Sequence, residues 1–319
     1  MPRNKVLVIG VTGQDGCYLS SLLLSKGYSV YGSSRDIESA DKSKLARLGV
    51  KDKVSYLSII PQDYRSVLRG IEQAEPDVIY YLASQSSVEF SFEQPAEVMY
   101  SSLNGILNVL EACRHFDKRI RIYHASSSEI FGDTNGIPAL EETKFNPRSP
   151  YGVAKASATM LVKNYREAYG MFACSGVMFN HESPLRHSRF VTQKICSAVR
   201  EISLGNEQKI ELNNISVTRD WGWAPEYVDA MIRMMVCDSP RDLVIATGKP
   251  MPLVAFIEAA FQARNLDWRE YVTVKAKNSR PIDIEVSMGD PSRAAMEIGW
   301  TAQTTGHQVA EKMVNDVLF

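Results

Sequence analysis

The sequence predicts an α/β fold, in which a doubly wound parallel sheet is joined to a smaller, interwoven C-terminal domain. Apolar strand patterns alternate with helical patterns over residues 5–180. The first strand pattern leads directly into a glycine-rich turn and a helix, the order found at nucleotide sites of such sheets. After residue 180 the alternation becomes irregular. We therefore expect one domain at 1–180 and a second mainly at 181–319, with a segment of about 215–248 returning to the first.

Runs rich in apolar and β-branched residues predict the strands, because a strand buried on both faces has this composition. The expected strands of the first domain are 5–9, 27–35, 54–60, 76–82, 119–125 and 172–179. Helical patterns follow at 18–24, from residue 64, at 95–115 and from residue 151, and residues 36–48 should form a loop with a short helix. In the second domain we expect helices at 190–204 and 227–237, strands at 209–212 and 243–248, and two or three closing helices.

Composition excludes several classes of protein. The 319 residues are 45% hydrophobic and 23% charged, with a formal net charge of −1, so the chain lacks the basic surface of a nucleic-acid binder. No apolar run approaches the roughly 20 residues of a membrane span. The apolar run at 6–9 lies too close to Met1 to be the core of a signal peptide. These features predict a cytoplasmic protein without a nucleic-acid or membrane partner.

The cysteines and histidines predict neither disulfides nor a metal site. The sequence has 5 cysteines and 5 histidines, without a CxxC pair or the spacing of metal ligands. The cysteines are therefore interpreted as small buried residues in a reducing compartment.

The glycine-rich turn has the spacing GxxGxxG, formed by Gly10, Gly13 and Gly16. Glycines between a strand and a helix let a ligand approach the backbone, and the helix N-terminus attracts a pyrophosphate. The alternative is a tight turn that binds nothing. The strand and helix on either side favour nucleotide binding.

The end of the second strand indicates which nicotinamide cofactor binds. An acidic residue there would bind the ribose hydroxyls of NAD, whereas this chain has Ser34 followed by Arg35. Arginine suits the 2′-phosphate of NADP, so NADP is favoured, although Asp36 follows directly and opposes this interpretation.

Two further strand ends are candidates for cofactor contacts. Asp63 follows the third strand and could meet an adenine amino group, or it could only cap the helix that begins at Tyr64. The fourth strand ends in Ala83-Ser-Gln-Ser86, whose small side chains would let a cofactor lie across the strand ends.

Tyr151 and Lys155 are the first candidate catalytic pair. Their spacing of four places both side chains on one face of a predicted helix. A neighbouring ammonium can lower the pKa of the phenol, which could then take a proton from a sugar hydroxyl. The alternative is a solvated helix face, because YxxxK also occurs by chance.

Ser127 and Glu129 follow the fifth strand and supply a second proton-transfer group. If this segment is extended, the hydroxyl and the carboxylate point the same way, at the sheet edge where ligands bind. The alternative is that Glu129 only caps a turn.

Six motifs in order identify a family resemblance. GxTGQDGxYL, SSSEIFG, SPYGVAK, NHESP, FVTQKI and TRDWG resemble the GDP-mannose 4,6-dehydratase family, a branch of the extended short-chain dehydrogenase/reductase superfamily with a Rossmann sheet. The resemblance covers almost the whole chain. It implies an NADP-binding domain at 1–180, a mainly sugar-nucleotide-binding domain at 181–319, and a homodimer or homotetramer joined through helices near 97–115 and 151–169.

The resemblance also implies the site residues, with NADP as cofactor, a GDP-sugar as substrate and no metal. The catalytic residues are Ser127, where the family has threonine, with Glu129, Tyr151 and Lys155. The cofactor contacts are Gly10, Thr12, Gly13, Gln14, Asp15, Gly16, Arg35, Asp63, Tyr64, Leu82, Ala83, Ser86, Tyr151, Lys155, His181 and Arg186. The substrate contacts are Ser86, Ser127, Glu129, Tyr151, Asn180, Lys194, Arg219 and Arg280. Surface salt bridging is the alternative role of Arg219 and Arg280.

Some positions depart from the family pattern where the family meets substrate and base. They are Leu185, His187, Gln193 and Asn213. A relative acting on another GDP-sugar, such as a GDP-heptose, therefore stays open. A sugar-nucleotide epimerase, which needs no acid at position 129, and a nucleotide-binding redox sensor without chemistry are further alternatives.

Overall fold

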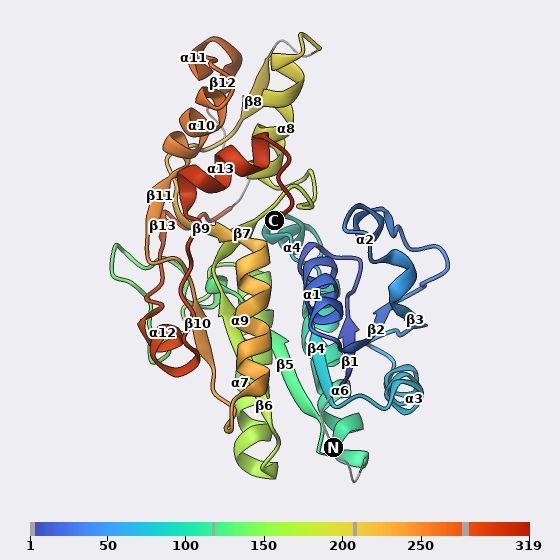
Figure 1. The fold of residues 1–319 in the computed structure, drawn as a ribbon. Coiled ribbons are helices and arrows are strands. Elements are labelled where there is room, and N and C mark those ends of the chain that lie inside the picture. Colours follow the sequence, from blue (N-terminus) through green and yellow to red (C-terminus); the bar gives the residue numbers. More distant parts are fainter. Residues whose placement is uncertain (1–3, 117–118, 207–208, 276–280) are drawn as a thin grey trace.

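The computed structural model describes residues 4–116, 119–206, 209–275 and 281–319 (Figure 1). Its main sheet has seven strands in the order β10-β6-β5-β4-β1-β2-β3, and every neighbouring pair is parallel. The strands are β1 (Lys5–Ile9), β2 (Ser29–Ser34), β3 (Ser55–Ser58), β4 (Val78–Tyr81), β5 (Arg121–Ala125), β6 (Ala173–Met178) and β10 (Leu243–Ile245). The strand order reverses beside β1, between β2 and β4, which is where such sheets bind ligands. The predicted fold class is confirmed.

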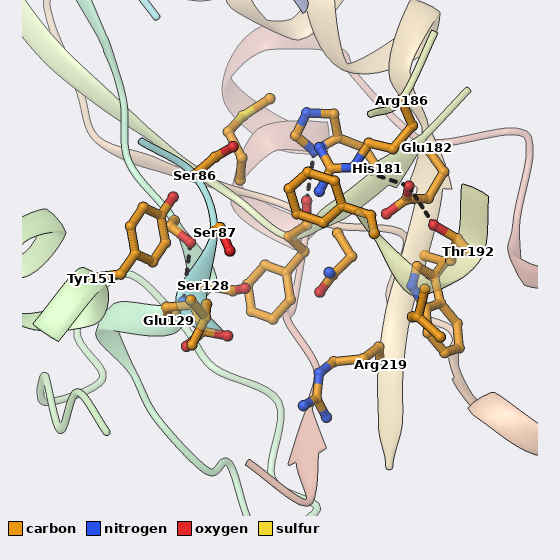
Figure 2. Close-up of a pocket in the computed structure, with 18 of the residues that line it drawn as sticks. Ser86, Ser87, Ser128, Glu129, Tyr151, His181, Glu182, Arg186, Thr192 and Arg219 are labelled. Atoms are coloured by element: carbon orange, nitrogen blue, oxygen red, sulfur yellow. Dashed lines mark hydrogen bonds and ion pairs between the residues drawn. The ribbon is translucent and has the colours of Figure 1, made fainter. Parts of the chain in front are cut away.

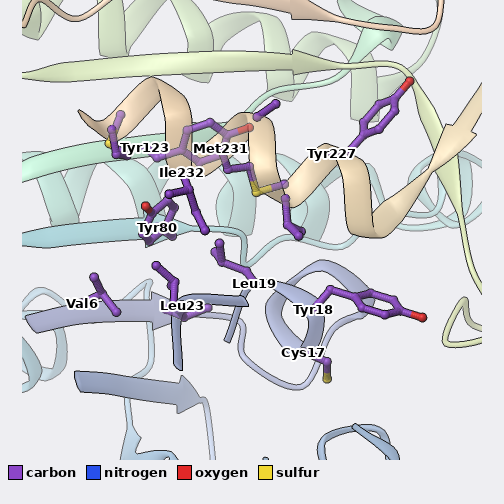
Figure 3. Close-up of a cluster of buried hydrophobic side chains, with 14 of the residues drawn as sticks. Val6, Cys17, Tyr18, Leu19, Leu23, Tyr80, Tyr123, Tyr227, Met231 and Ile232 are labelled. Carbon is purple, nitrogen blue, oxygen red and sulfur yellow. The ribbon is translucent and has the colours of Figure 1, made fainter. Parts of the chain in front are cut away.

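Helices cover both faces of this sheet. On one face lie α1 (Gln14–Ser25) and α9 (Ala224–Val236), and on the other α3 (Tyr64–Ala74), α6 (Gly105–His115) and α7 (Pro150–Tyr169). Alternate residues of β1 serve the two faces, since Val6 packs with α1 and α9 while Leu7 packs with α3 and α6. Figure 3 shows Leu19 and Leu23 of α1 facing Met231 and Ile232 of α9 across Tyr80.

The segment between β4 and β5 is more broken than predicted. A short helix, α4 (Val88–Glu93), precedes α5 (Pro95–Met99), and a π-helical segment (Tyr100–Asn104) joins α5 to α6. The predicted helix at 95–115 is thus continuous but contains a π turn. Helix α4 was not predicted; the Ser87 side chain caps it by accepting a hydrogen bond from the Phe90 N–H at 3.2 Å.

A second, smaller layer begins where β6 ends. Here β7 (Asn180–Glu182) pairs with β9 (Thr218–Trp223), which also pairs with β11 (Pro250–Pro252) and β13 (Val286–Ser287). Helices α8 (Val191–Ser203), α10 (Leu253–Gln262) and α13 (Gly306–Val314) enclose a separate apolar core beside this sheet. The remaining elements are α2 (Ser43–Arg47), β8 (Ile210–Leu212), α11 (Trp268–Tyr271), β12 (Val272–Val274) and α12 (Ser292–Ile298), and β8 pairs with β12.

The chain crosses between the two layers more than once. Strand β10 adds to the edge of the main sheet beside β6, although it follows the second-layer strand β9 in sequence. The division at residue 180 itself stays a prediction. Among the described helices, none has the length and apolarity that crossing a bilayer requires.

Candidate active site

A cavity of about 400 Å³ opens at the carboxyl ends of β4, β5 and β6, against β7, β9 and α8 (Figure 2). It lies at the sheet edge where the sequence predicts a site. The predicted residues that line it are Asp15, Leu82, Ser86, Ser127, Glu129, Tyr151, Lys155, Asn180, His181, Arg186, Lys194 and Arg219. The structure thus brings together residues from both layers.

Tyr151 and Lys155 lie in the first turns of α7 and are both buried. Pro150 starts the helix, and Ser149 caps it by accepting a hydrogen bond from the Gly152 N–H at 3.0 Å. The Lys155 Nζ lies 5.9 Å from the centroid of the Tyr151 ring and donates a hydrogen bond to the Ala125 carbonyl at 2.8 Å. The pair therefore faces the cavity, and the alternative of a solvated helix face is wrong.

The electrostatics of this pair differ from the expectation that Lys155 lowers the pKa of Tyr151. Burial raises the pKa of Tyr151 to about 12, against an opposing hydrogen bond with Ser127. Burial also lowers the pKa of Lys155 to about 8. Because the Lys155 ammonium is committed to a backbone carbonyl, it does not offset the desolvation of the phenol in this structure.

The backbone is extended at Ser127 but not at Glu129, so the condition under which the two side chains would point the same way is not met. A 3-10 turn (Ser128–Ile130) begins directly after Ser127, because the Ser127 Oγ accepts a hydrogen bond from the Glu129 N–H at 3.3 Å. The turn packs closely on α7, since a Cβ at Gly152 would lie 2.8 Å from the Glu129 carbonyl oxygen. Both side chains still line the cavity. Figure 2 shows Glu129 there together with Tyr151.

The glycine-rich turn is built for close backbone approach. Gly10 has φ +100°, and a Cβ there would lie 3.0 Å from the Ala83 nitrogen at the end of β4. A Cβ at Gly16 would lie 2.3 Å from the Gly10 oxygen, so α1 can begin this close to β1 only with glycine. The N-cap of α1 is Gly13, whose lack of a side chain leaves the helix N-terminus uncovered by a capping group. This end of α1 fits the pyrophosphate of a dinucleotide.

Gln14 has a different role from the predicted cofactor contact. Its side chain is buried, and its Nε2 donates to the His181 carbonyl and to Asp15 Oδ1, each at 3.1 Å. Its Oε1 accepts a hydrogen bond from the Ser183 hydroxyl at 2.8 Å. The side chain thus joins the glycine-rich turn to β7, so any contact with a cofactor falls to the Gln14 backbone.

Two acidic side chains contact basic side chains in the cavity wall. The Asp15 Oδ2 is 2.9 Å from the His181 Nε2, and the Glu182 Oε2 is 3.2 Å from the Arg186 Nε. Glu182 also accepts a hydrogen bond from the Thr192 hydroxyl at 2.8 Å. Sequence reasoning missed Glu182 and Thr192; the acid at i and arginine at i+4 in NHESPLR was the signal that could have found Glu182.

The predicted substrate contacts from the second layer are placed as follows. Arg219 is buried and donates to the Thr218 carbonyl at 2.9 Å, so the alternative of surface salt bridging is wrong for it. Asp283 lies 3.5 Å from its guanidinium. Lys194 donates to the Glu211 carbonyl at 2.6 Å, while Arg280 lies outside the described residues.

Other predicted residues do not line the cavity. Those the structure describes outside its lining are Gly10, Thr12, Gly13, Gln14, Gly16, Arg35, Asp63, Tyr64 and Ala83. Asp63 is the N-cap of α3 and accepts a hydrogen bond from the Arg65 N–H at 2.9 Å, which supports the capping alternative. Of the four positions that depart from the family pattern, the lining includes Asn213 and not Leu185, His187 or Gln193.

No group of three or more His, Cys, Asp or Glu side chains within the described ranges could hold a metal ion. The five cysteines are free thiols, and Cys237 is the partly exposed one.

Comparison with known proteins identifies the family. A model of the family described as GDP-mannose 4,6 dehydratase matches residues 7–313. The chain belongs to this family. GDP-mannose 4,6 dehydratase 2 of Caenorhabditis elegans is 40% identical, with 98% of this chain and 88% of the relative covered. The human GDP-mannose 4,6 dehydratase is 36% identical, with 98% and 91% covered. As a member of this family, the protein is an enzyme of the dehydratase (lyase) class.

Solved structures agree on the fold of this family member. The UDP-glucose 4-epimerase of Thermus thermophilus, in complex with NAD, superposes with a TM-score of 0.85 at 22% identity, covering 98% of both chains. RMD of Pseudomonas aeruginosa, in complex with NADPH, superposes with a TM-score of 0.80 at 20% identity, also covering 98% of both chains.

Proposed function

We propose that this enzyme converts GDP-mannose to GDP-4-keto-6-deoxymannose, with NADP as a bound hydride carrier. One observation carries the proposal: Ser127, Glu129, Tyr151 and Lys155 all line a single cavity, at the edge of the sheet reached by the glycine-rich turn. The relatives named above are GDP-mannose 4,6-dehydratases, and their similarity extends over nearly the whole chain.

The glycine-rich turn and the N-terminus of α1 fit a nicotinamide dinucleotide. Without side chains at Gly10 and Gly16, the turn packs directly against the end of β4 and the start of α1, which leaves the helix N-terminus open to a phosphate. When bound, such a cofactor would supply hydride transfer, as the temporary acceptor of the hydride that C4 loses and that C6 gains. Tyr151, Lys155, Asp15, His181 and Arg186 line the cavity on the side where it would lie.

The protein's own groups move the protons. Tyr151 removes the proton from O4 as C4 is oxidised, and Lys155 lowers the pKa of the phenol for this step when its ammonium turns from the Ala125 carbonyl towards it. The C4 ketone makes the C5 proton acidic. Glu129 removes that proton and then protonates the departing C6 hydroxyl, so that one water is lost. C5 takes up one proton when the hydride returns to C6, which balances the proton that Tyr151 took from O4, so there is no net oxidation. Ser127 holds the C4 oxygen in place.

The second layer supplies the substrate contacts. Arg219 lies in the cavity wall with part of its guanidinium held by backbone carbonyls, a rigid arrangement that suits a diphosphate. Asn180 and Lys194 line the same wall, and we assign them to the nucleotide sugar. Arg280 keeps its predicted role as a second diphosphate contact.

Arg35 supports NADP over NAD. It is exposed directly after β2, and the competing Asp36 is occupied by its own loop, because its carboxylate accepts from the Ser39 hydroxyl at 2.6 Å and the Glu38 N–H at 3.1 Å. We therefore expect Arg35→Ala to weaken NADPH binding by about 10- to 100-fold. This is the loss of affinity that corresponds to the free energy of one hydrogen bond to a charged group. NADH binding should not change.

Fluorescence titration of both reduced cofactors measures this effect. Arg69→Ala is the control, since Arg69 is an exposed arginine on α3. Equal loss of NADPH and NADH affinity in Arg35→Ala would refute a 2′-phosphate contact.

A second candidate substrate is favoured by Asn213. This residue departs from the family pattern, and it lines the cavity. A dehydratase acting on another GDP-sugar, such as GDP-manno-heptose, would use the same four catalytic residues. Mass spectrometry after separate incubation with GDP-mannose and GDP-manno-heptose, with catalytic NADP⁺, decides between them. Loss of one water from the heptose only would overturn GDP-mannose as the substrate.

We also infer a homodimer or homotetramer. Exposed apolar side chains lie on α7 and beside α6, where the family resemblance places the subunit contact: Val153, Met160, Tyr169 and Tyr100. The cytoplasmic location stays a prediction.

A further inference from the structure

His181 has an acceptor at each of its two ring nitrogens. The Nδ1 lies 2.7 Å from the Phe179 carbonyl oxygen, and the Nε2 lies 2.9 Å from the Asp15 Oδ2. The ring is buried and stacks on Tyr227, with centroids 4.7 Å apart and planes 21° apart. Both ring nitrogens are thus fixed in direction.

A neutral imidazole carries one N–H and cannot donate to both partners. The Phe179 carbonyl can only accept. Asp15 could donate only if it were protonated. Burial raises the pKa of its carboxyl group, but the contact with His181, the hydrogen bond from Gln14 and the charge of Arg186 together lower that pKa to about 2. In a neutral ring, the lone pair of one ring nitrogen would therefore face a lone pair of the Phe179 carbonyl or of the Asp15 carboxylate. Protonation of both ring nitrogens removes this repulsion.

The charges around the ring agree with a cation. Burial alone would lower the pKa of His181, and the charge of Arg186 lowers it too, but the charge and hydrogen bond of Asp15 raise it overall above its ordinary value. Glu182 offsets Arg186 at 3.2 Å, so the four groups make two neutral pairs. Tyr227, packed on the ring from α9, has a pKa raised by burial and stays uncharged.

Asp15 lies in the first turn of α1, where an ionised carboxylate would repel the phosphates of a dinucleotide. We propose that His181 is an imidazolium at neutral pH and that it acts as a positioning residue, neutralising Asp15 so that an anionic cofactor can approach the glycine-rich turn. This role rests on the proposed function. The charge state of His181 does not, and it can be measured in the protein alone.

Nitrogen-15 NMR of the histidine side chains tests the charge directly. At pH 7.5 we expect His181 to show two protonated ring nitrogens. His124 is the internal control: its Nδ1 contacts the Ser175 hydroxyl at 3.1 Å, and burial lowers its pKa well below the ordinary value, so it should be neutral. In Asp15→Asn, whose amide can donate to Nε2, the His181 ring should also become neutral. A neutral His181 in the wild-type protein would overturn the proposal.

The sign of the pH dependence follows from the raised pKa of His181. Its contribution to stability is complete below the unfolded value of about 6.5 and is lost as pH rises through the folded value. The His181 resonances should therefore titrate above those of an exposed histidine.

Cofactor affinity tests the role. We expect His181→Gln to weaken NADPH binding by about 10-fold or more, because Asp15 is left uncompensated near the phosphates. Adding Asp15→Asn to His181→Gln should recover most of that loss. A structural role or a direct contact of His181 with the cofactor predicts no such recovery.

Direct titration with NADPH, together with circular dichroism to check folding, gives the readout for all three variants. If the double variant bound no better than His181→Gln, the neutralising role would be refuted. If the wild-type protein bound no nicotinamide dinucleotide at all, the proposed function would fail and this role with it, while the NMR result would still decide the charge.

Discussion

Replacing Tyr151 with phenylalanine is expected to lower kcat by about 10²- to 10⁴-fold, the usual contribution of a positioned proton-transfer group. The variant loses only the hydroxyl that takes the O4 proton, so no hydride should leave C4. The fold should be retained, because the ring still fills its buried position and the Ser127 hydroxyl keeps its hydrogen bond from the Glu129 N–H.

Steady-state kinetics with GDP-mannose measure this loss, and thermal unfolding checks the fold. The matched control is Tyr165→Phe on the same helix, whose hydroxyl bonds Glu111 outside the cavity. Wild-type turnover by Tyr151→Phe would remove Tyr151 from the mechanism.

Replacing Glu129 with glutamine should separate oxidation from water loss. Glu129 lines the same cavity as Ser127 and Tyr151. The amide of glutamine can neither remove the C5 proton nor protonate the leaving hydroxyl. Tyr151 and Lys155 remain, so C4 should still be oxidised. We expect dehydration to fall by about 10²- to 10⁴-fold while NADPH accumulates on the enzyme.

Absorbance of the reduced nicotinamide in a single-turnover experiment detects this accumulation. Glu167→Gln serves as the control, because Glu167 is an exposed acid at the far end of α7 that pairs with Lys163. Full dehydratase activity in Glu129→Gln would show that Glu129 is not the proton-transfer group of the elimination.

Strands β1, β4 and β6 of the main sheet could be predicted because they are buried on both faces. Val6 and Leu7 pack against opposite helix layers, which leaves a continuous apolar run in the sequence. The glycine turn could be predicted for a similar reason, since the close packing at Gly10 and Gly16 excludes any side chain. The π segment at 100–104 has no such local signal.

Several residues that line the cavity could be predicted from the sequence, but their local conformation could not. Spacing placed Tyr151 and Lys155 on one face, but their pKa values depend on burial by walls from distant segments. The turn after Ser127 depends on packing against Gly152, which no short pattern contains. Likewise, the pairing of Asp15 with His181 joins α1 to β7 through the tertiary fold.

The most direct test of a 4,6-dehydratase is the fate of a deuterium placed at C4 of GDP-mannose. With the enzyme and catalytic NADP⁺, we predict a product that has lost one water and kept the deuterium, now at C6, without accumulation of NADPH. This result requires oxidation, elimination and hydride return at one bound cofactor. A product of unchanged mass, or a dehydrated product without the label, would contradict the mechanism assigned to Tyr151 and Glu129.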